Sequence, residues 1–167
     1  INRIRFFFIS LFLLISFSSY KSGSTKPVYI TMFLITGFLL ASAIFWEILL
    51  RKISYSRWIK YISTSIDLIS VFGLKYGMHF DTNFGWALAM KEPATFDLFF
   101  LYICLAGLRL DKKFSLFTGF FSIALYVILL ILSVGSGWMS FTGDPSKFLD
   151  IHYLRAPTEI SKILFLM

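Results

Sequence analysis

Two ionisable residues sit inside apolar stretches, where they could carry chemistry that surface residues cannot. Asp67 falls within one such stretch, and Arg109 lies near the end of another. An ionised carboxylate in an apolar medium is costly unless it is paired or wetted, so an Asp67–Arg109 pair is expected. The pair could change between two states of the molecule, or be static and fix helix register. Alternatively, Arg109 extends to lipid headgroups.

Small and polar residues recur around Asp67 at helical spacing. Ser63, Asp67, Ser70, Leu74 and Gly77 fall on one narrow face of a predicted helix. Such a face packs against other helices and not against lipid, and Gly73 with Gly77 forms a GxxxG pair that permits close approach. The candidate residues for packing and signalling inside the membrane are therefore Asp67, Arg109, Ser63, Ser70, Gly73 and Gly77.

Two histidines, His79 and His152, fall in or beside polar loops. Together with Asp81, Asp144 and Asp150 they could form a metal or pH-sensing site on the outer side. No HxxxH or HxxE spacing supports a metal site, and ordinary surface residues are the alternative. We therefore predict no metal-binding residue and keep the histidines only as sensing candidates.

Sequence signatures of catalysis are missing from the chain. It contains no GxSxG, P-loop, HExxH or CxxC motif, and its single cysteine, Cys104, lies in an apolar run. The cysteine is expected to be a small packing residue. We predict no catalytic residue and no cofactor in this segment.

The composition is that of a membrane protein. Of the 167 residues, 57% are hydrophobic, 20% are aromatic and only 15% are charged. Twenty-one Phe are too many for one small aqueous core, so much apolar surface must face lipid. The net charge of +7 would suggest nucleic acid in a soluble protein. Here the basic residues flank apolar runs, which favours a membrane and excludes a nucleic-acid partner.

Apolar runs long enough to span a bilayer predict an all-α integral membrane protein. We expect one transmembrane domain over 1–167, a bundle of about six helices whose sixth is truncated, with a cytoplasmic output domain after 167. The predicted helices cover approximately 4–20, 28–50, 58–80, 93–110, 114–134 and 158–167 onward.

Lys and Arg are more abundant in alternate loops, which predicts the orientation. The richer set holds Arg3 and Arg5, the 51–60 loop and the 109–113 loop, so the N-terminus is expected in the cytoplasm. The loops over 81–92 and 139–157 then lie outside and could form a small cap. Lys75 and Lys91 are expected to anchor at the outer interface.

Three stretches resemble a known kind of membrane anchor. Arg57 to Asp67 (RWIKYISTSID), Phe99 to Asp111 (FFLYICLAGLRLD) and Lys113 to Tyr126 (KFSLFTGFFSIALY) are similar to the third to fifth helices of the N-terminal anchors of bacterial class III adenylate/guanylate cyclases. Arg155 to Leu166 resembles their entry into a sixth helix. The likeness covers approximately residues 51–167.

The resemblance implies a multi-pass module in the bacterial inner membrane that regulates a cytoplasmic cyclase domain through its last helix. That domain would form cyclic AMP from ATP, or cyclic GMP from GTP, with two Mg or Mn ions. Its catalytic sites form between two chains, so a homodimer is implied. No catalytic residue of the cyclase maps onto this chain. The expected partners are the lipid bilayer, a second copy, and an extracytoplasmic or lipid ligand.

Other functions remain open from the sequence. The same kind of module precedes histidine kinases, phosphatases and diguanylate cyclases. A small transporter is another alternative, although no inverted repeat is visible and only Asp67 and Arg109 are deep ionisable candidates. A structural assembly factor is the last.

Overall fold

The structure is a computed structural model of the whole chain, and the part that it describes is mostly helical. The described residues are 9–10, 13–14, 16–17, 26–52, 57–81, 84–91, 93–108, 111–144, 146–147, 150 and 152–166.

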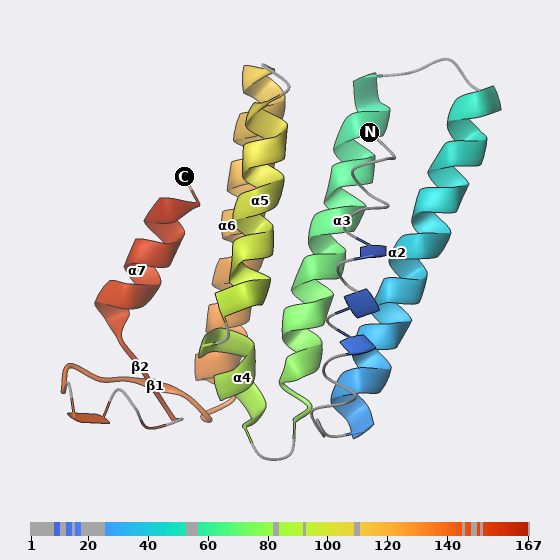
Figure 1. The fold of residues 1–167 in the computed structure, drawn as a ribbon. Coiled ribbons are helices and arrows are strands. Elements are labelled where there is room, and N and C mark those ends of the chain that lie inside the picture. Colours follow the sequence, from blue (N-terminus) through green and yellow to red (C-terminus); the bar gives the residue numbers. More distant parts are fainter. Residues whose placement is uncertain are drawn as a thin grey trace.

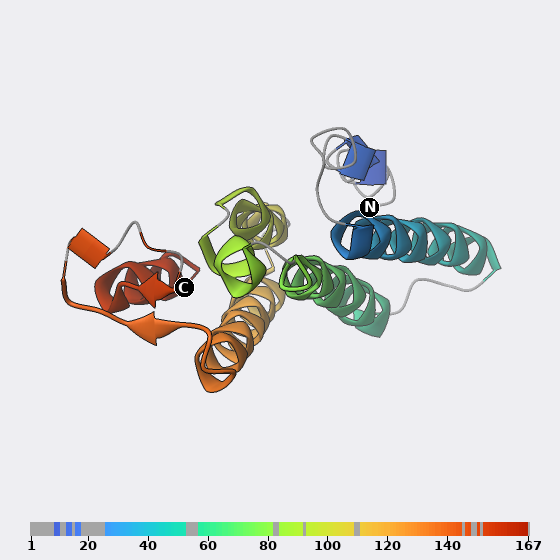
Figure 2. The same cartoon turned by 90° about the horizontal axis from the view of Figure 1, so that it is seen from below.

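The longer helices stand side by side, and a shorter helix near the C-terminus lies beside them (Figure 1). In chain order the elements are α2 (Lys26–Lys52), α3 (Arg57–Met78), α4 (Gly85–Lys91), α5 (Pro93–Gly107), α6 (Lys112–Gly135), β1 (Ser140–Phe141), β2 (Tyr153–Leu154) and α7 (Ala156–Phe165). Helix α3 is central, because it contacts α2, α4, α5 and α6. Figure 2 shows α2 on one side of α3, with α5, α6 and then α7 following on the other side.

The prediction of a mostly helical chain is confirmed, and five described helices match predicted ones. Helices α2, α3, α5, α6 and α7 correspond to the predictions over 28–50, 58–80, 93–110, 114–134 and 158–167. The first predicted helix, 4–20, lies largely outside the described residues, although those described between Ile9 and Phe17 are helical. Helix α4 was missed, because a seven-residue helix has no apolar run long enough to mark it.

Local signals set several helix ends. Asp111 is the N-cap of α6, and its side chain accepts a hydrogen bond from the Phe114 N–H at 3.2 Å. Helix α7 has a proline in its first turn, where the missing N–H costs nothing. Helix α4 begins at Gly85, whose φ of +46° lies in the left-handed region that glycine tolerates best.

Long helices in this fold turn hydroxyl groups inward and large apolar side chains outward. Ser63, Thr64 and Ser70 of α3 are buried, as are Thr118, Ser122 and Ser133 of α6. On the outer surface, α2 and α6 expose Phe33, Leu34, Phe38, Ile44, Phe45, Ile48, Leu116, Phe120, Ile128, Ile131 and Leu132.

Buried hydroxyls on these helices use their own helix as a partner. Thr36 donates to Met32 O at 2.7 Å, and Thr118 donates to Phe114 O at 2.9 Å. A hydrogen bond to the carbonyl of the preceding turn gives a buried hydroxyl a partner within its own helix.

By length and composition, two described helical segments could cross a membrane. They are Val28–Leu49 in α2 and Lys112–Gly135 in α6. Helix α3 is less apolar because it carries Lys60, Asp67 and Lys75. Helices α5 and α7 have 15 and 10 described residues, which is short for a full crossing.

The connection from α6 to α7 contains a short strand pairing. Strands β1 and β2 lie parallel, with Ser140 opposite Tyr153 and Phe141 opposite Leu154. Met139 and Leu154 are buried beside this pairing, which brings the chain back to the lower end of α6 in Figure 1. Helix α7 then runs back along α6.

Candidate functional site

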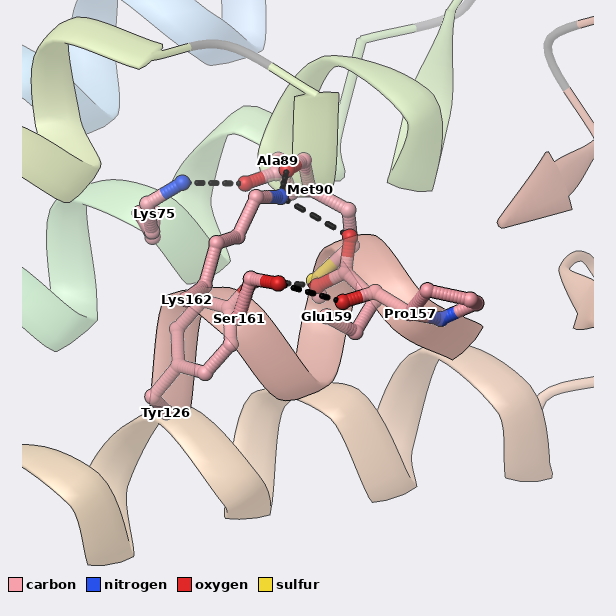
Figure 3. Close-up of polar contacts among 8 residues, drawn as sticks. All are labelled: Lys75, Ala89, Met90, Tyr126, Pro157, Glu159, Ser161 and Lys162. Carbon is pink, nitrogen blue, oxygen red and sulfur yellow. Dashed lines mark hydrogen bonds and ion pairs between the residues drawn. The ribbon is translucent and has the colours of Figure 1, made fainter. Parts of the chain in front are cut away.

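A cluster of polar side chains joins four helices at the end of the bundle where α4 lies. Figure 3 shows Lys75 from α3, Ala89 and Met90 from α4, Tyr126 from α6, and Glu159 and Lys162 from α7. We call these residues the polar cluster. Lys75, Tyr126 and Glu159 are almost completely buried, with exposed fractions of 0%, 0% and 3%.

Two lysines of the cluster satisfy backbone carbonyls at the C-terminal end of α4. Lys75 Nζ donates to Ala89 O at 2.8 Å, and Lys162 Nζ donates to Met90 O at 3.1 Å. The last carbonyls of a helix lack partners within it and carry its partial negative charge, so cations are favourable there. The short helix α4 is therefore held from one side by α3 and from the other by α7.

Glu159 is the acceptor at the centre of the cluster. Its Oε1 receives a hydrogen bond from Lys162 Nζ at 2.9 Å, one turn along α7, and its Oε2 receives the Tyr126 hydroxyl. Hydrogen bonds to a charged acceptor are stronger than neutral ones. Glu159 also lies in the first turn of α7, where the helix dipole favours a negative charge.

Lys91 extends the network to the α6–α7 connection. Its ammonium donates to the Asp150 backbone carbonyl at 2.5 Å. Partial burial lowers the pKa of Lys91, and the nearby Asp150 and Glu159 oppose that change. Helix α4 is thus linked to the connection before α7 as well as to α7 itself.

A second polar contact lies at the opposite end of α3 and α6. Lys60 donates to the Asp111 carboxylate, and its ammonium stands 5.2 Å from the Tyr61 ring centre and 5.3 Å from that of Phe114. The Lys60 hydrogen bond, helped by the Phe114 N–H, holds the pKa of Asp111 below its ordinary value. This contact fixes the start of α6 against α3.

In chemical terms, the polar cluster positions helices. Its donors and acceptors are engaged with one another or with backbone carbonyls, and the Tyr126 hydroxyl is buried together with the Glu159 carboxylate that accepts from it. No protein-family model, curated protein or solved structure matches this chain. A functional proposal therefore rests on these contacts and on the resemblance of residues 51–167.

The structure buries the predicted polar face of α3. Ser63, Asp67 and Ser70 have exposed fractions of 6%, 5% and 4%. Ser70 donates to Ile66 O at 2.8 Å. Arg109, the predicted partner of Asp67, lies outside the described residues.

The two glycines of the predicted GxxxG pair face α2. A methyl group placed on Gly77 would lie 2.4 Å from Thr31 Cγ2, and one placed on Gly73 would lie 3.4 Å from Ile35 Cδ1. Close approach at Gly77 therefore depends on the absence of a side chain. The two helices pack through small residues here, as in other helix pairs with such motifs.

The two predicted sensing histidines have different surroundings. His79 lies among aromatic rings, with centre-to-centre distances of 4.5 Å to Phe80 and 4.6 Å to Trp86. His152 is exposed, and its Nδ1 lies 3.2 Å from Trp138 O. Among the described residues no three His, Cys, Asp or Glu side chains are grouped to hold a metal ion.

The acidic loop residues considered with the histidines accept hydrogen bonds from nearby backbone N–H groups. Asp81 Oδ1 accepts from the Phe84 N–H at 2.9 Å, just before α4 begins. Asp144 accepts from the Ser146 N–H and hydroxyl, which lowers the pKa of Asp144. Asp150 Oδ1 accepts from the His152 N–H at 3.0 Å. Each carboxylate stabilises a turn.

Sequence reasoning missed most of the polar cluster. Lys75 was expected at the outer interface, and this expectation is wrong, because the side chain is completely buried against α4. Tyr126, Glu159 and Lys162 were not singled out. The available signals were a tyrosine inside a strongly apolar helix and an acidic residue three positions before a lysine. Neither signal predicts which residue of another helix the side chain contacts.

Proposed function

We propose that this chain is an integral membrane domain that anchors and regulates a homodimeric class III adenylate or guanylate cyclase. In this proposal about six helices cross the bacterial inner membrane, with the N-terminus in the cytoplasm. Signals pass through the last helix to a cytoplasmic catalytic domain. The two metal ions of the cyclase belong to that catalytic domain and not to these helices.

One observation carries the membrane part of the proposal. Helices α2 and α6 expose large side chains such as Leu34 and Phe120, at 69% and 64%, while Thr36 and Thr118 are buried at 1% and 0%. In water, polar groups belong outside and apolar groups inside. The reverse pattern suits lipid, where small and hydroxyl residues pack helices together and apolar residues face the acyl chains.

The arrangement of charge supports the proposed orientation. Lys60, Lys112 and Lys113 lie at the same end of α3 and α6, opposite the polar cluster. Basic residues are enriched on the cytoplasmic side of membrane helices. The polar cluster and the α6–α7 connection then belong to the outer side, which gives an external signal direct access to the start of α7.

The contacts of α7 support the regulatory part of the proposal. Helix α7 is joined to α6 through Tyr126 and Glu159, and to α4 through Lys162 and Met90. A ligand that binds two arrangements of α4 with different affinity would change the position of α7 through these contacts. The cyclase itself is proposed from the resemblance of residues 51–167.

The test is an activity measurement on the parent cyclase in membranes. We expect deletion of residues 1–167 to release activity into the soluble fraction and to change basal or regulated turnover. Glu159→Gln should change regulation while the protein stays in the membrane. Unchanged basal and regulated activity in both variants would contradict the regulatory role and leave only an anchor.

A small transporter is the second candidate, because the structure adds buried ionisable groups beyond those expected. Lys75 and Glu159 are buried, as is Asp67. Buried ionisable residues in membrane helices often line ion pathways. Proton or cation flux into liposomes that contain the purified chain would favour this candidate, and a comparison with Glu159→Gln would show whether the polar cluster lies on the path.

A further inference from the structure

Two hollows lie end to end along the groove between α5 and α6. The first encloses about 120 Å³ and is lined by Ile103, Ser115, Leu116, Gly119, Phe120 and Ile123. The second is a shallow hollow of about 420 Å³, open at the surface, and it is lined by Gly107, Asp111, Lys112, Ser115 and Leu116. Because Ser115 and Leu116 line both, the two hollows form one continuous groove, which we call the α5–α6 groove.

Both parts of the α5–α6 groove are lined mainly by apolar surface, and among the described residues ionisable side chains line only the second part. Its first part is walled mainly by hydrocarbon, such as Ile103 and Ile123. Its second part ends at the exposed Lys112, in the first turn of α6, next to the exposed Lys113. The carboxylate at this end, Asp111, already accepts hydrogen bonds from Lys60 and from the Phe114 N–H.

We propose that the α5–α6 groove binds one anionic phospholipid, with its phosphate at Lys112 and an acyl chain along Ile103, Gly119 and Ile123. Because Asp111 is already paired with Lys60, Lys112 offers its positive charge to an anionic headgroup, and the apolar lining suits a hydrocarbon chain. At about 120 Å³, the first part has room for a stretch of one acyl chain but is too small to hold a turn of a second helix.

This inference rests on the proposed membrane function and orientation. Lys112 then faces the cytoplasmic leaflet, whose anionic lipids attract basic residues near the membrane surface. Basic pockets between transmembrane helices on that side are a common kind of headgroup site. A lipid in the groove would also lie near α7, since a methyl group on Gly119 would be 3.4 Å from the Leu166 carbonyl oxygen.

Native mass spectrometry of the purified chain tests the site. The chain is transferred into mixed micelles with equal amounts of phosphatidylglycerol and phosphatidylcholine. We expect one retained phosphatidylglycerol per chain. Lys112→Gln should weaken its retention about fivefold, the factor for ~1 kcal/mol per basic residue near the surface. Ser115→Leu should fill the groove and remove retention of either lipid.

Matched variants separate a specific site from general effects. Lys113→Gln removes the same charge from the next residue, and Ala124→Leu adds bulk at an exposed position of α6 outside the groove. Both should retain the lipid. Equal losses in Lys112→Gln and Lys113→Gln, or no preference for phosphatidylglycerol, would overturn the inference. If Ser115→Leu disrupts a dimer and leaves lipid retention unchanged, the lipid assignment is wrong and the groove binds a second copy of the chain.

Membrane extraction shows whether only the lipid assignment of the groove fails or whether the proposed membrane function fails as well. If the chain resists alkaline extraction but shows no specific lipid, only the groove assignment is wrong. If the chain is released as a soluble protein, the membrane proposal and the groove assignment both fail. Helix content by circular dichroism shows whether Ser115→Leu still folds, and Lys112→Gln keeps the test decisive if it does not.

Discussion

The contact between α2 and α3 and the contacts among α4, α6 and α7 are built in opposite ways. Helices α2 and α3 meet at Gly77 and Thr31, so closely that a single methyl group would clash. Helix α7 is held instead by side-chain hydrogen bonds from Tyr126 and Lys162. Close packing of small residues permits one geometry, whereas a polar contact can be exchanged for water or another partner. Of the described helices in these two contacts, we therefore expect α7 to change position more readily than α2 or α3.

The largest expected effect on stability is at the hydrogen-bonded contacts of α7. Glu159→Ala should lower the free energy of unfolding by about 3 kcal/mol, because it leaves the buried Tyr126 hydroxyl without its acceptor and leaves Lys162 with Met90 O alone. Reversible unfolding in mixed detergent micelles measures the change. A double-mutant cycle of Tyr126→Phe and Glu159→Gln should give a coupling of about 1–2 kcal/mol. Additive effects would mean that the two side chains do not interact.

A slightly smaller effect on stability is expected at the close contact between α2 and α3. Gly77→Ala should destabilise the bundle by about 1–2 kcal/mol, since the new methyl group meets Thr31 Cγ2 and overpacking forces the helices apart. Thr31→Ser in the same chain removes that methyl group and should restore most of the loss.

The matched control for Gly77→Ala is Gly37→Ala. A methyl group on Gly37 meets nothing within 4 Å, so this change should be neutral or stabilising through helix propensity. The same unfolding titration measures all three variants. Equal effects at Gly37 and Gly77 would show that α2 and α3 do not approach closely.

The smallest effect is expected at the Lys60–Asp111 contact. The Lys60 hydrogen bond lowers the folded-state pKa of Asp111, so its stabilisation is present above the unfolded pKa of about 4 and disappears as pH falls through the lower folded value. Asp111→Asn keeps an acceptor for the Phe114 N–H but loses the charge. This variant should flatten the pH dependence of stability below about pH 4. A profile identical to the wild type would exclude the contact.

The helices could be predicted from the sequence, because each long apolar run marks one and local residues mark its ends. The Pro in the first turn of α2 and the Pro in the first turn of α7 are examples. The face of small and polar residues on α3 could also be predicted, from their helical spacing in the sequence. By contrast, Glu159 and Tyr126 lie 33 positions apart, and neither has a spacing that names the other. Burial of Lys75 depended on α4, a helix too short to leave a periodic signal.

The central claim is that the apolar outer faces lie in lipid, and electron paramagnetic resonance of spin labels on α6 tests it most directly. Labels are attached to single cysteines at Phe120 and Ile131, both exposed, in a Cys104→Ser background and reconstituted in liposomes. We predict collisions with oxygen, which dissolves in lipid, and none with a water-soluble nickel chelate. Labels at both positions that collide freely with the nickel chelate would contradict the membrane assignment.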